Sequence, residues 1–126
     1  MSSRSEAGET EQRWRRPSSV EQEMIGRLLA VDFPGRDELW TQSDSLTAKG
    51  LDAEGSIALN PGSSANAANV ERRVPVEAEF EDTDGVTVHV LLHVVDGLIN
   101  ELEIYREDSG PVLGDRLSNE WRLLVL

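Results

Sequence analysis

Residues 74–108 read VPVEAEFEDTDGVTVHVLLHVVDGLINELEIYRED, and this stretch decides the fold class. Apolar and polar residues alternate in three runs, which is the pattern of strands with one buried face. Two Asp-Gly pairs, Asp84-Gly85 and Asp96-Gly97, separate the runs. Asp-Gly is typical of tight turns between paired strands. The stretch therefore predicts three consecutive antiparallel strands.

The register of these strands follows from which side chains must share a face, because a slip of one residue moves every side chain to the other face. A three-residue loop that ends in glycine at each turn keeps the apolar residues together. This register pairs Phe80 with Val88, Val90 with Leu102, and Val88 with Ile104. The apolar face should then be covered by helices.

Two helices are predicted before the strands. Ser18 and Glu21 have the spacing of a capping box, in which each side chain satisfies a free backbone N–H of the first helical turn. Pro34 ends this helix, since the residue before proline avoids helical geometry. A second, shorter helix should run from Gly35 to about Ser45. The apolar stripe of the first helix consists of Val20, Met24, Leu28 and Val31, with Ile25 and Leu29 beside them.

The rest of the chain completes an α+β fold. Residues 46–51 and 56–60 flank a turn sequence and predict a hairpin, and residues 61–69 read as a flexible loop. The apolar end, residues 121–126, should dock as an edge strand or cover the core. We expect two N-terminal helices packed on one face of a four- to five-stranded antiparallel meander sheet. The single domain would span residues 17–126, after a disordered tail at 1–16.

Composition excludes several classes of function. The chain of 126 residues has no cysteine, which excludes disulfides, thiol nucleophiles and cysteine-ligated zinc. No apolar run is long enough to span a membrane, and the N-terminus lacks a secretory signal, so we expect a cytoplasmic protein. No phosphate-binding glycine loop, nucleophile elbow or dinucleotide motif occurs, so we expect no cofactor.

The charge of the chain is unevenly distributed. The formal net charge is −12, and residues 74–108 hold ten carboxylates against one base, Arg106. A surface of this kind repels phosphate backbones, so we expect no nucleic acid partner. A basic protein or a cation is the partner that such a charge favours, although acidity can also serve solubility alone.

The candidate site lies on the polar face of the predicted strands. The expected register places three side chains in one row across the strands, with a second row beside it. His93 lies four residues further along the strand from His89, roughly 13 Å away at strand rise, so the two histidines cannot share a metal. The first row holds Glu79, His89 and Glu103, the second holds Glu77, Leu91 and Glu101, and Tyr105 lies nearby.

Two kinds of function fit these residues. The leading hypothesis is a non-enzymatic interaction domain, for example immunity-like or antitoxin-like, that binds a basic partner through its acidic sheet face. The alternative is a metal-binding or acid–base enzyme site around His89, Glu79 and Glu103. A third interpretation is structural, because half-exposed antiparallel sheets normally carry polar residues on the solvated face.

One segment also carries a family resemblance. The run VLLHVVDGLINELEIYRED at residues 90–108, with FPGRDEL at 33–39 and EGS at 54–56, resembles a small bacterial domain family of unknown function. The resemblance covers about residues 17–113, and the composition suggests an actinobacterial type of source. It implies a capped helix followed by an acidic three-strand meander, and it brings no activity or site residue. The chain departs from the family in the loop at 61–69 and beyond Leu113.

Overall fold

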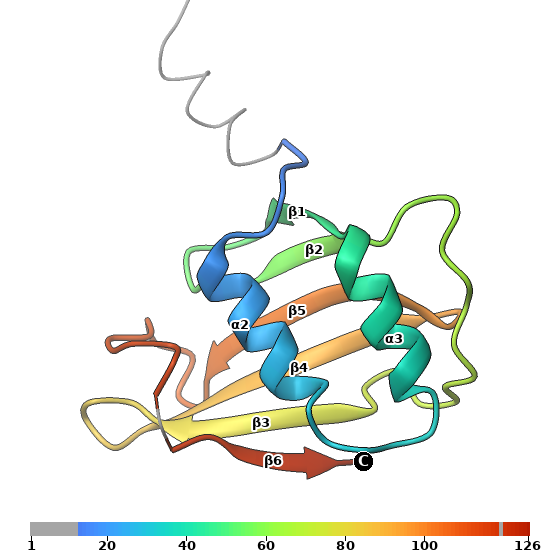
Figure 1. Cartoon of the computed structure of the whole chain (residues 1–126). Helices are drawn as coiled ribbons and strands as arrows, with labels where there is room; N and C mark the ends of the chain where they lie inside the picture. The colour runs from blue at the N-terminus through green and yellow to red at the C-terminus, as the bar shows by residue number, and fades with distance from the viewer. Residues whose placement is uncertain (1–12, 119) are drawn as a thin grey trace, which may run out of the picture.

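The computed structural model describes residues 13–118 and 120–126. Two helices lie across one face of a single antiparallel sheet (Figure 1). The helices are α2 (Ser19–Leu28) and α3 (Arg36–Gln42), followed by a short 3-10 helix, η1 (Ser43–Ser45). The strands are β1 (Thr47–Gly50), β2 (Ile57–Asn60), β3 (Val76–Glu81), β4 (Thr87–Val95), β5 (Leu98–Arg106) and β6 (Arg122–Val125).

The expected α+β class is confirmed, but the sheet is larger than predicted. Its order is β1-β2-β5-β4-β3-β6, so six strands replace the expected four or five. Strands β3, β4 and β5 form the predicted meander, whereas the β1–β2 hairpin lies beside β5 and β6 pairs with β3. The sixth strand comes from the apolar C-terminal segment, which docks as an edge strand.

The first helix begins as the sequence predicts. The side chain of Ser18 accepts a hydrogen bond from the amide of Glu21, and the Glu21 carboxylate accepts one from the amide of Ser18. Met24, Ile25 and Leu28 of the predicted stripe are buried against the sheet. Val20 is instead 40% exposed, and the helix ends at Leu28, before Leu29 and Val31. On the second helix, Leu39 is buried, whereas Trp40 is 46% exposed.

The first turn of the meander also agrees with the prediction. Phe80 pairs with Val88, and Asp82 donates its amide to the carbonyl of Val86 across the turn. The loop therefore has three residues, 83–85, and Gly85 takes the left-handed conformation at φ 87°. Glycine reaches this region without the penalty that a Cβ imposes. The predicted β3–β4 register is confirmed.

The second turn differs from the prediction. Val95 pairs with Leu98, so the loop has two residues, Asp96 and Gly97, at φ 54° and 77°. Two positive φ values in succession are the mark of a type I′ turn, which matches the twist of a hairpin. The register then shifts between His93 and Val94, and Asn100 is left without a partner as a bulge.

The bulge changes every later pair in β5. Val90 faces Ile104 instead of Leu102, and Val88 faces Arg106 instead of Ile104. The predicted β4–β5 register is therefore wrong by two residues, although the apolar face is right. A two-residue turn alone would have set Val90 opposite Glu103, and the extra residue in the bulge restores the apolar alternation.

Gln42 holds this turn in place from α3. Its side-chain amide donates to the carbonyls of Asn66 and Gly97, and its oxygen accepts from the amide of Ile99. Gln42 is only 3% exposed, so these bonds satisfy a buried polar group. A Cβ on Gly97 would lie 2.4 Å from the carbonyl oxygen of Ala68. Because the two backbone segments approach each other so closely, this position requires glycine.

The predicted N-terminal tail and the predicted loop at 61–69 both contain residues that form backbone hydrogen bonds with the sheet region. Arg15 exchanges two backbone hydrogen bonds with Ala48, so contacts with the sheet begin before Pro17, the expected start of the domain. The first twelve residues of the expected tail lie outside the described residues. In the loop at 61–69, Ala68 donates its amide to Gly97. The flexibility of that loop stays a prediction. No helix in the described part of the chain has the length and apolar character needed to cross a membrane.

Phe80 lies at the centre of the core, at 1% exposure, and its ring stacks on Trp121 with centroids 6.1 Å apart. We expect Phe80→Ala to lower the free energy of unfolding by about 3–5 kcal/mol, because it removes a buried ring and leaves a cavity. The half-exposed Trp40 provides the control, since Trp40→Ala should cost less than about 1 kcal/mol. Urea denaturation measures both, and equal losses would contradict the assignment of Phe80 to the core.

Candidate functional site

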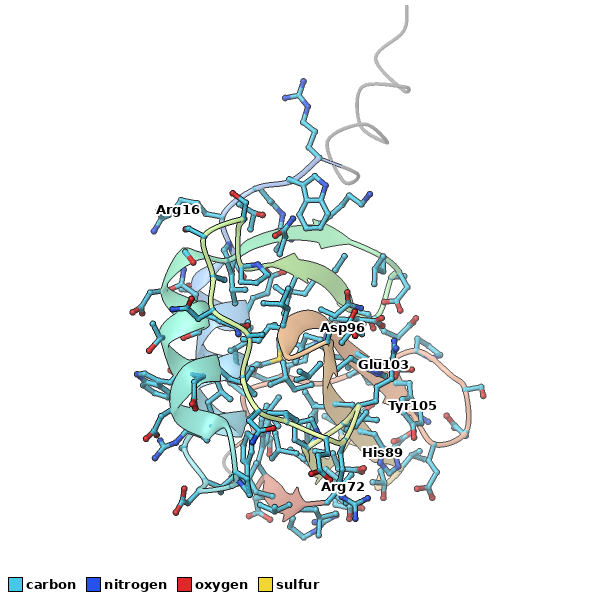
Figure 2. The ribbon with its side chains drawn as sticks, turned by 90° about the vertical axis from the view of Figure 1, so that its right-hand side faces the viewer. Arg16, Arg72, His89, Asp96, Glu103 and Tyr105 are labelled. Carbon is cyan, nitrogen blue, oxygen red and sulfur yellow. The ribbon has the colours of Figure 1, made fainter. Side chains whose placement is uncertain are left out.

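The face of the sheet opposite the helices carries the candidate residues. Figure 2 shows His89, Glu103 and Tyr105 on the side away from α2 and α3. Side chains alternate along the central strands, so each buried apolar residue has a polar, partly exposed neighbour. We call this surface the open face; its polar side chains in the three central strands and just beyond β5 are those of Glu77, Glu79, Glu81, Thr87, His89, His93, Glu101, Glu103, Tyr105 and Glu107.

The bulge in β5 rearranges the predicted rows. His89 lies between Glu79 on β3 and Tyr105 on β5, not between Glu79 and Glu103. Glu103 is displaced by one row and lies opposite Leu91. The predicted trio of Glu79, His89 and Glu103 is therefore wrong in its third member, because the sequence contains no mark of the bulge.

His89 is surrounded by carboxylates from β3 and from the residue just beyond β5. Its Nδ1 lies 3.4 Å from an oxygen of Glu77 and 3.8 Å from one of Glu79, and its Nε2 lies 2.9 Å from Glu107. The ring stacks on Tyr105 with centroids 4.8 Å apart. Glu107 was not among the predicted residues, although it follows Tyr105 by two and so falls on the same face.

His93 forms a separate group on the same strand. Its Nε2 lies 2.8 Å from Glu103, and its Nδ1 accepts a hydrogen bond from Nε of Arg73. Since Nδ1 is an acceptor, the hydrogen-bond network assigns the ring proton to Nε2, which donates to Glu103. Glu101 lies opposite His93 on β5. His93 is thus a bridge between one cation and one carboxylate.

Two of the carboxylates are partly neutralised by the C-terminal strand. The guanidinium of Arg122 bonds Glu79 at 3.1 Å and Glu81 at 3.2 Å. Nothing in the local pattern around Arg122 predicts these partners, which lie more than forty residues earlier in the chain. Their ion pairs are solvent-exposed on one side and so reduce repulsion more than they add stability.

The negative charge of the open face affects the pKa of Tyr105. Burial raises the pKa of its hydroxyl, and the negative charges of Glu77, Glu103, Glu107 and Glu79 raise it further. Because each carboxylate disfavours a second anion nearby, the phenol stays protonated and can donate a hydrogen bond. Tyr105 is 39% exposed, so the donor is accessible on the surface.

Two groups on the open face have the composition of a metal site. The potential ligand atoms of Glu77, Glu79 and His89 all lie within 4.8 Å of one another, and so do those of His93, Glu101 and Glu103. Divalent cations such as Zn²⁺ and Mn²⁺ accept imidazole and carboxylate ligands. The predicted residues thus divide into two groups, each with one histidine.

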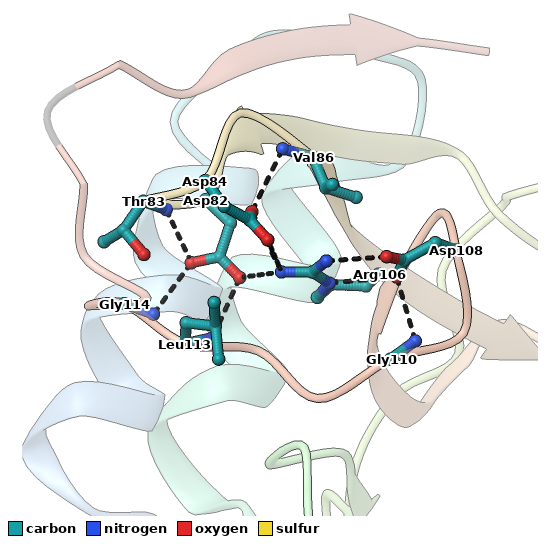
Figure 3. Close-up of polar contacts among 9 residues, drawn as sticks. All are labelled: Asp82, Thr83, Asp84, Val86, Arg106, Asp108, Gly110, Leu113 and Gly114. Carbon is teal, nitrogen blue, oxygen red and sulfur yellow. Dashed lines mark hydrogen bonds and ion pairs between the residues drawn. The ribbon is translucent and has the colours of Figure 1, made fainter.

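A second polar cluster lies at the end of the sheet, with Arg106 and Asp82 buried and Asp84 and Asp108 exposed (Figure 3). Arg106 bonds Asp82, Asp84 and Asp108 at 2.6–3.0 Å. Asp82 also accepts the amides of Thr83, Leu113 and Gly114. The side chain of Asp82 has no exposed surface, so these hydrogen bonds take the place of the ones that its carboxylate would make with water. This cluster joins the first turn of the meander and the end of β5 to the segment after β5, which is a structural role.

Comparison with known proteins gives one match. The family model described as a domain of unknown function, DUF6984, covers residues 14–114 of the chain.

The chain belongs to this family.

The match confirms the expected membership of an uncharacterised domain family and extends slightly beyond the predicted range of 17–113 at both ends. No curated protein matches the chain, and no solved structure does. The DUF6984 region includes both histidine groups and ends before β6, so the strand that carries Arg122 lies outside the family match.

The buried carboxylate of Asp82 should make the domain sensitive to acid. Burial would raise its pKa, but the amides of Leu113 and Thr83, the Arg106 guanidinium and the amide of Gly114 outweigh this and lower the pKa to about 2. A depressed pKa contributes stability above the usual value near 4, and this contribution is lost as the pH falls towards 2. The cluster therefore favours folding at neutral pH.

We expect Asp82→Asn to lower the free energy of unfolding at neutral pH, because it removes the charge that the amides and Arg106 contact. The difference from wild type should shrink as the pH falls from about 4 to about 2, where the native carboxylate also takes up a proton. Urea denaturation at a series of pH values measures this. A difference that stays constant down to pH 2 would mean that the charge of Asp82 contributes nothing.

Proposed function

We propose that this domain is a non-enzymatic protein-interaction module whose open face docks a basic surface of another protein. The observation that carries the proposal is the concentration of glutamates on one face of β3 and β5, on the side that the helices leave uncovered. Complementary potentials of this kind accelerate and orient association. An immunity-like or antitoxin-like role, in a bacterial cytoplasm, is one concrete form of this function.

The geometry of the open face supports docking better than acid–base catalysis. Catalytic carboxylates and histidines act in concave sites that exclude water. His89, Glu103 and Tyr105 instead lie along the outer surface of a sheet (Figure 2). Glu107 and Glu103 have side chains 64% and 37% exposed, so a partner can reach both of them.

We expect charge reversal on the open face to weaken partner binding. Wild type should retain a partner from native lysate at low salt and release it at high salt, since exposed charges are screened. Glu103→Lys with Glu107→Lys should weaken binding of the purified partner about tenfold or more. The control is Asp37→Lys with Glu38→Lys, which makes the same change of net charge on α3, in the helical layer. Equal losses in both variants, or binding insensitive to salt, would refute a role for this face.

A second candidate function rests on the group around His89. We propose that Glu77, Glu79 and His89 hold a divalent cation. The Nε2 of His89 lies against the carboxylate of Glu107, so a neutral ring protonated at Nε2 directs the lone pair of Nδ1 towards Glu77 and Glu79. Histidines that ligate metals commonly donate their other ring N–H to a carboxylate in this way.

The group around His93 is less suited to a cation. Its Nδ1 is an acceptor for Arg73, so the nitrogen that faces Glu103 carries the proton and has no lone pair to offer. The guanidinium of Arg73 also adds a positive charge beside the ring. The two histidines of one strand thus provide a matched pair for a binding experiment.

We expect calorimetric titration of Zn²⁺ or Mn²⁺ to show binding to wild type that His89→Ala weakens at least about tenfold, because it removes the only nitrogen ligand. His93→Ala should bind as wild type does. Ca²⁺, which prefers oxygen ligands, should respond least to the loss of His89. Absence of binding to wild type, or equal binding by all three proteins, would exclude the cation site.

A further inference from the structure

The two edges of the sheet differ in how far another segment covers them. At the β1 edge, Arg15 exchanges backbone hydrogen bonds with Ala48, so the segment before α2 covers part of that edge. At the other edge, β6 is the last strand in the sheet order and pairs with β3 alone among the described strands. Proteins usually protect such an edge with charges, prolines, bulges or a covering segment, because its free backbone groups can pair with another chain.

The outward backbone groups of β6 can be assigned from one hydrogen bond. The amide of Leu126 donates to the carbonyl of Pro75, which makes this a hydrogen-bonded pair of the β3–β6 ladder. Such pairs alternate with pairs whose backbone groups point away from each other. By this alternation Arg122 and Leu124 bond to β3, whereas the N–H and C=O groups of Leu123 and Val125 point to the outer edge.

The side chains along this edge are apolar and exposed. Leu124, Val125 and Leu126 are 44%, 51% and 47% exposed. The strand contains no carboxylate, and its one charged residue, Arg122, is bound to Glu79 and Glu81. For a chain with a net charge of −12, β6 therefore brings no acidic side chain of its own to a contact between two copies.

We propose that β6 pairs with β6 of a second copy of this chain, across a two-fold axis at Leu124. In this antiparallel register Leu123 of each copy faces Val125 of the other, and both residues have their backbone groups directed outward. The two copies thus exchange hydrogen bonds without any change in the β3–β6 ladder. The contact is isologous and closes at two copies, since each edge is used once.

Side-chain contacts support the same register. Leu124 of one copy lies opposite Leu124 of the other on the open face, and Leu123 and Val125 pair on the helix side. The arrangement joins the two sheets into one continuous sheet. Because side chains opposite each other share a face, the two-fold axis is perpendicular to the sheet and both open faces lie on the same side. The dimer therefore presents two acidic surfaces in one direction, which goes beyond the single docking face proposed above.

Sedimentation velocity over about a hundredfold range of protein concentration tests the proposal, because dimerisation is concentration-dependent. Wild type should change from monomer to dimer across this range, and added salt should favour the dimer by screening the net charge. Val125→Pro removes an outward N–H that β3 does not use, and Leu124→Lys places two like charges opposite each other. Both variants should sediment as monomers.

Leu51→Lys is the matched control, since Leu51 is 50% exposed beyond the opposite edge strand. It should dimerise as wild type does. Circular dichroism identifies a variant that fails to fold, and Leu124→Lys, which leaves the backbone unchanged, then decides the question. Amide exchange at Leu123 and Val125 should also slow as the concentration of wild type rises. A wild type that stays monomeric throughout, or folded edge variants that dimerise undiminished, would overturn the proposal.

Discussion

The constraint on which the open face depends is that β4 and β5 must keep their apolar residues on one side. The Asp96-Gly97 turn has two residues, and by itself it would set Val90 opposite Glu103. The bulge at Asn100 adds one residue and returns Leu102 and Ile104 to the core. Because a strand alternates strictly, this single insertion decides which face every later side chain of β5 occupies. It also decides which histidine the glutamates of β5 and Glu107 just beyond it meet.

Buried polar groups hold the strands in that register. Gln42 satisfies the backbone at Gly97 and Ile99, and Ser56 both accepts from and donates to the backbone of Ile104. At the other end, Asp82 and Arg106 connect the first turn to the segment after β5. A buried polar group costs free energy unless it is bonded, so each of these residues favours one arrangement over its alternatives. The open face is consequently displayed by a rigid frame.

On the open face, positive side chains offset part of the repulsion between the glutamates. Like charges on adjacent strands destabilise a sheet, and here two histidines, Arg73 and Arg122 are interleaved with the glutamates. The glutamates differ in exposure, since the side chains of Glu107 and Glu103 are 64% and 37% exposed, whereas those of Glu77 and Glu79 are 19% and 27% exposed. A basic partner and a divalent cation would exploit the same excess of negative charge. Under the two proposals, they would use different parts of the face.

Much of the fold could be predicted from the sequence because its causes are local. The capping box of Ser18 and Glu21, the alternation of β3 and β4, and the three-residue loop at Gly85 all depend on neighbours a few residues apart. The acidic character of one face also follows from alternation alone. These features can be predicted without knowing which distant segments of the chain contact each other.

The tertiary structure decided the rest, for a reason visible at the second turn. A three-residue loop and a two-residue loop followed by a bulge place the same apolar residues inward, so the pattern of residues 86–106 is compatible with both. The choice was made by contacts from Gln42 and from Ala68, far from the turn in sequence. Arg73 and Arg122 likewise reach the open face from outside the central meander. The sequence alone determined that an acidic face with histidines exists and that Glu79 lies beside His89, and long-range contacts determined which carboxylates from β5 and just beyond it each histidine meets.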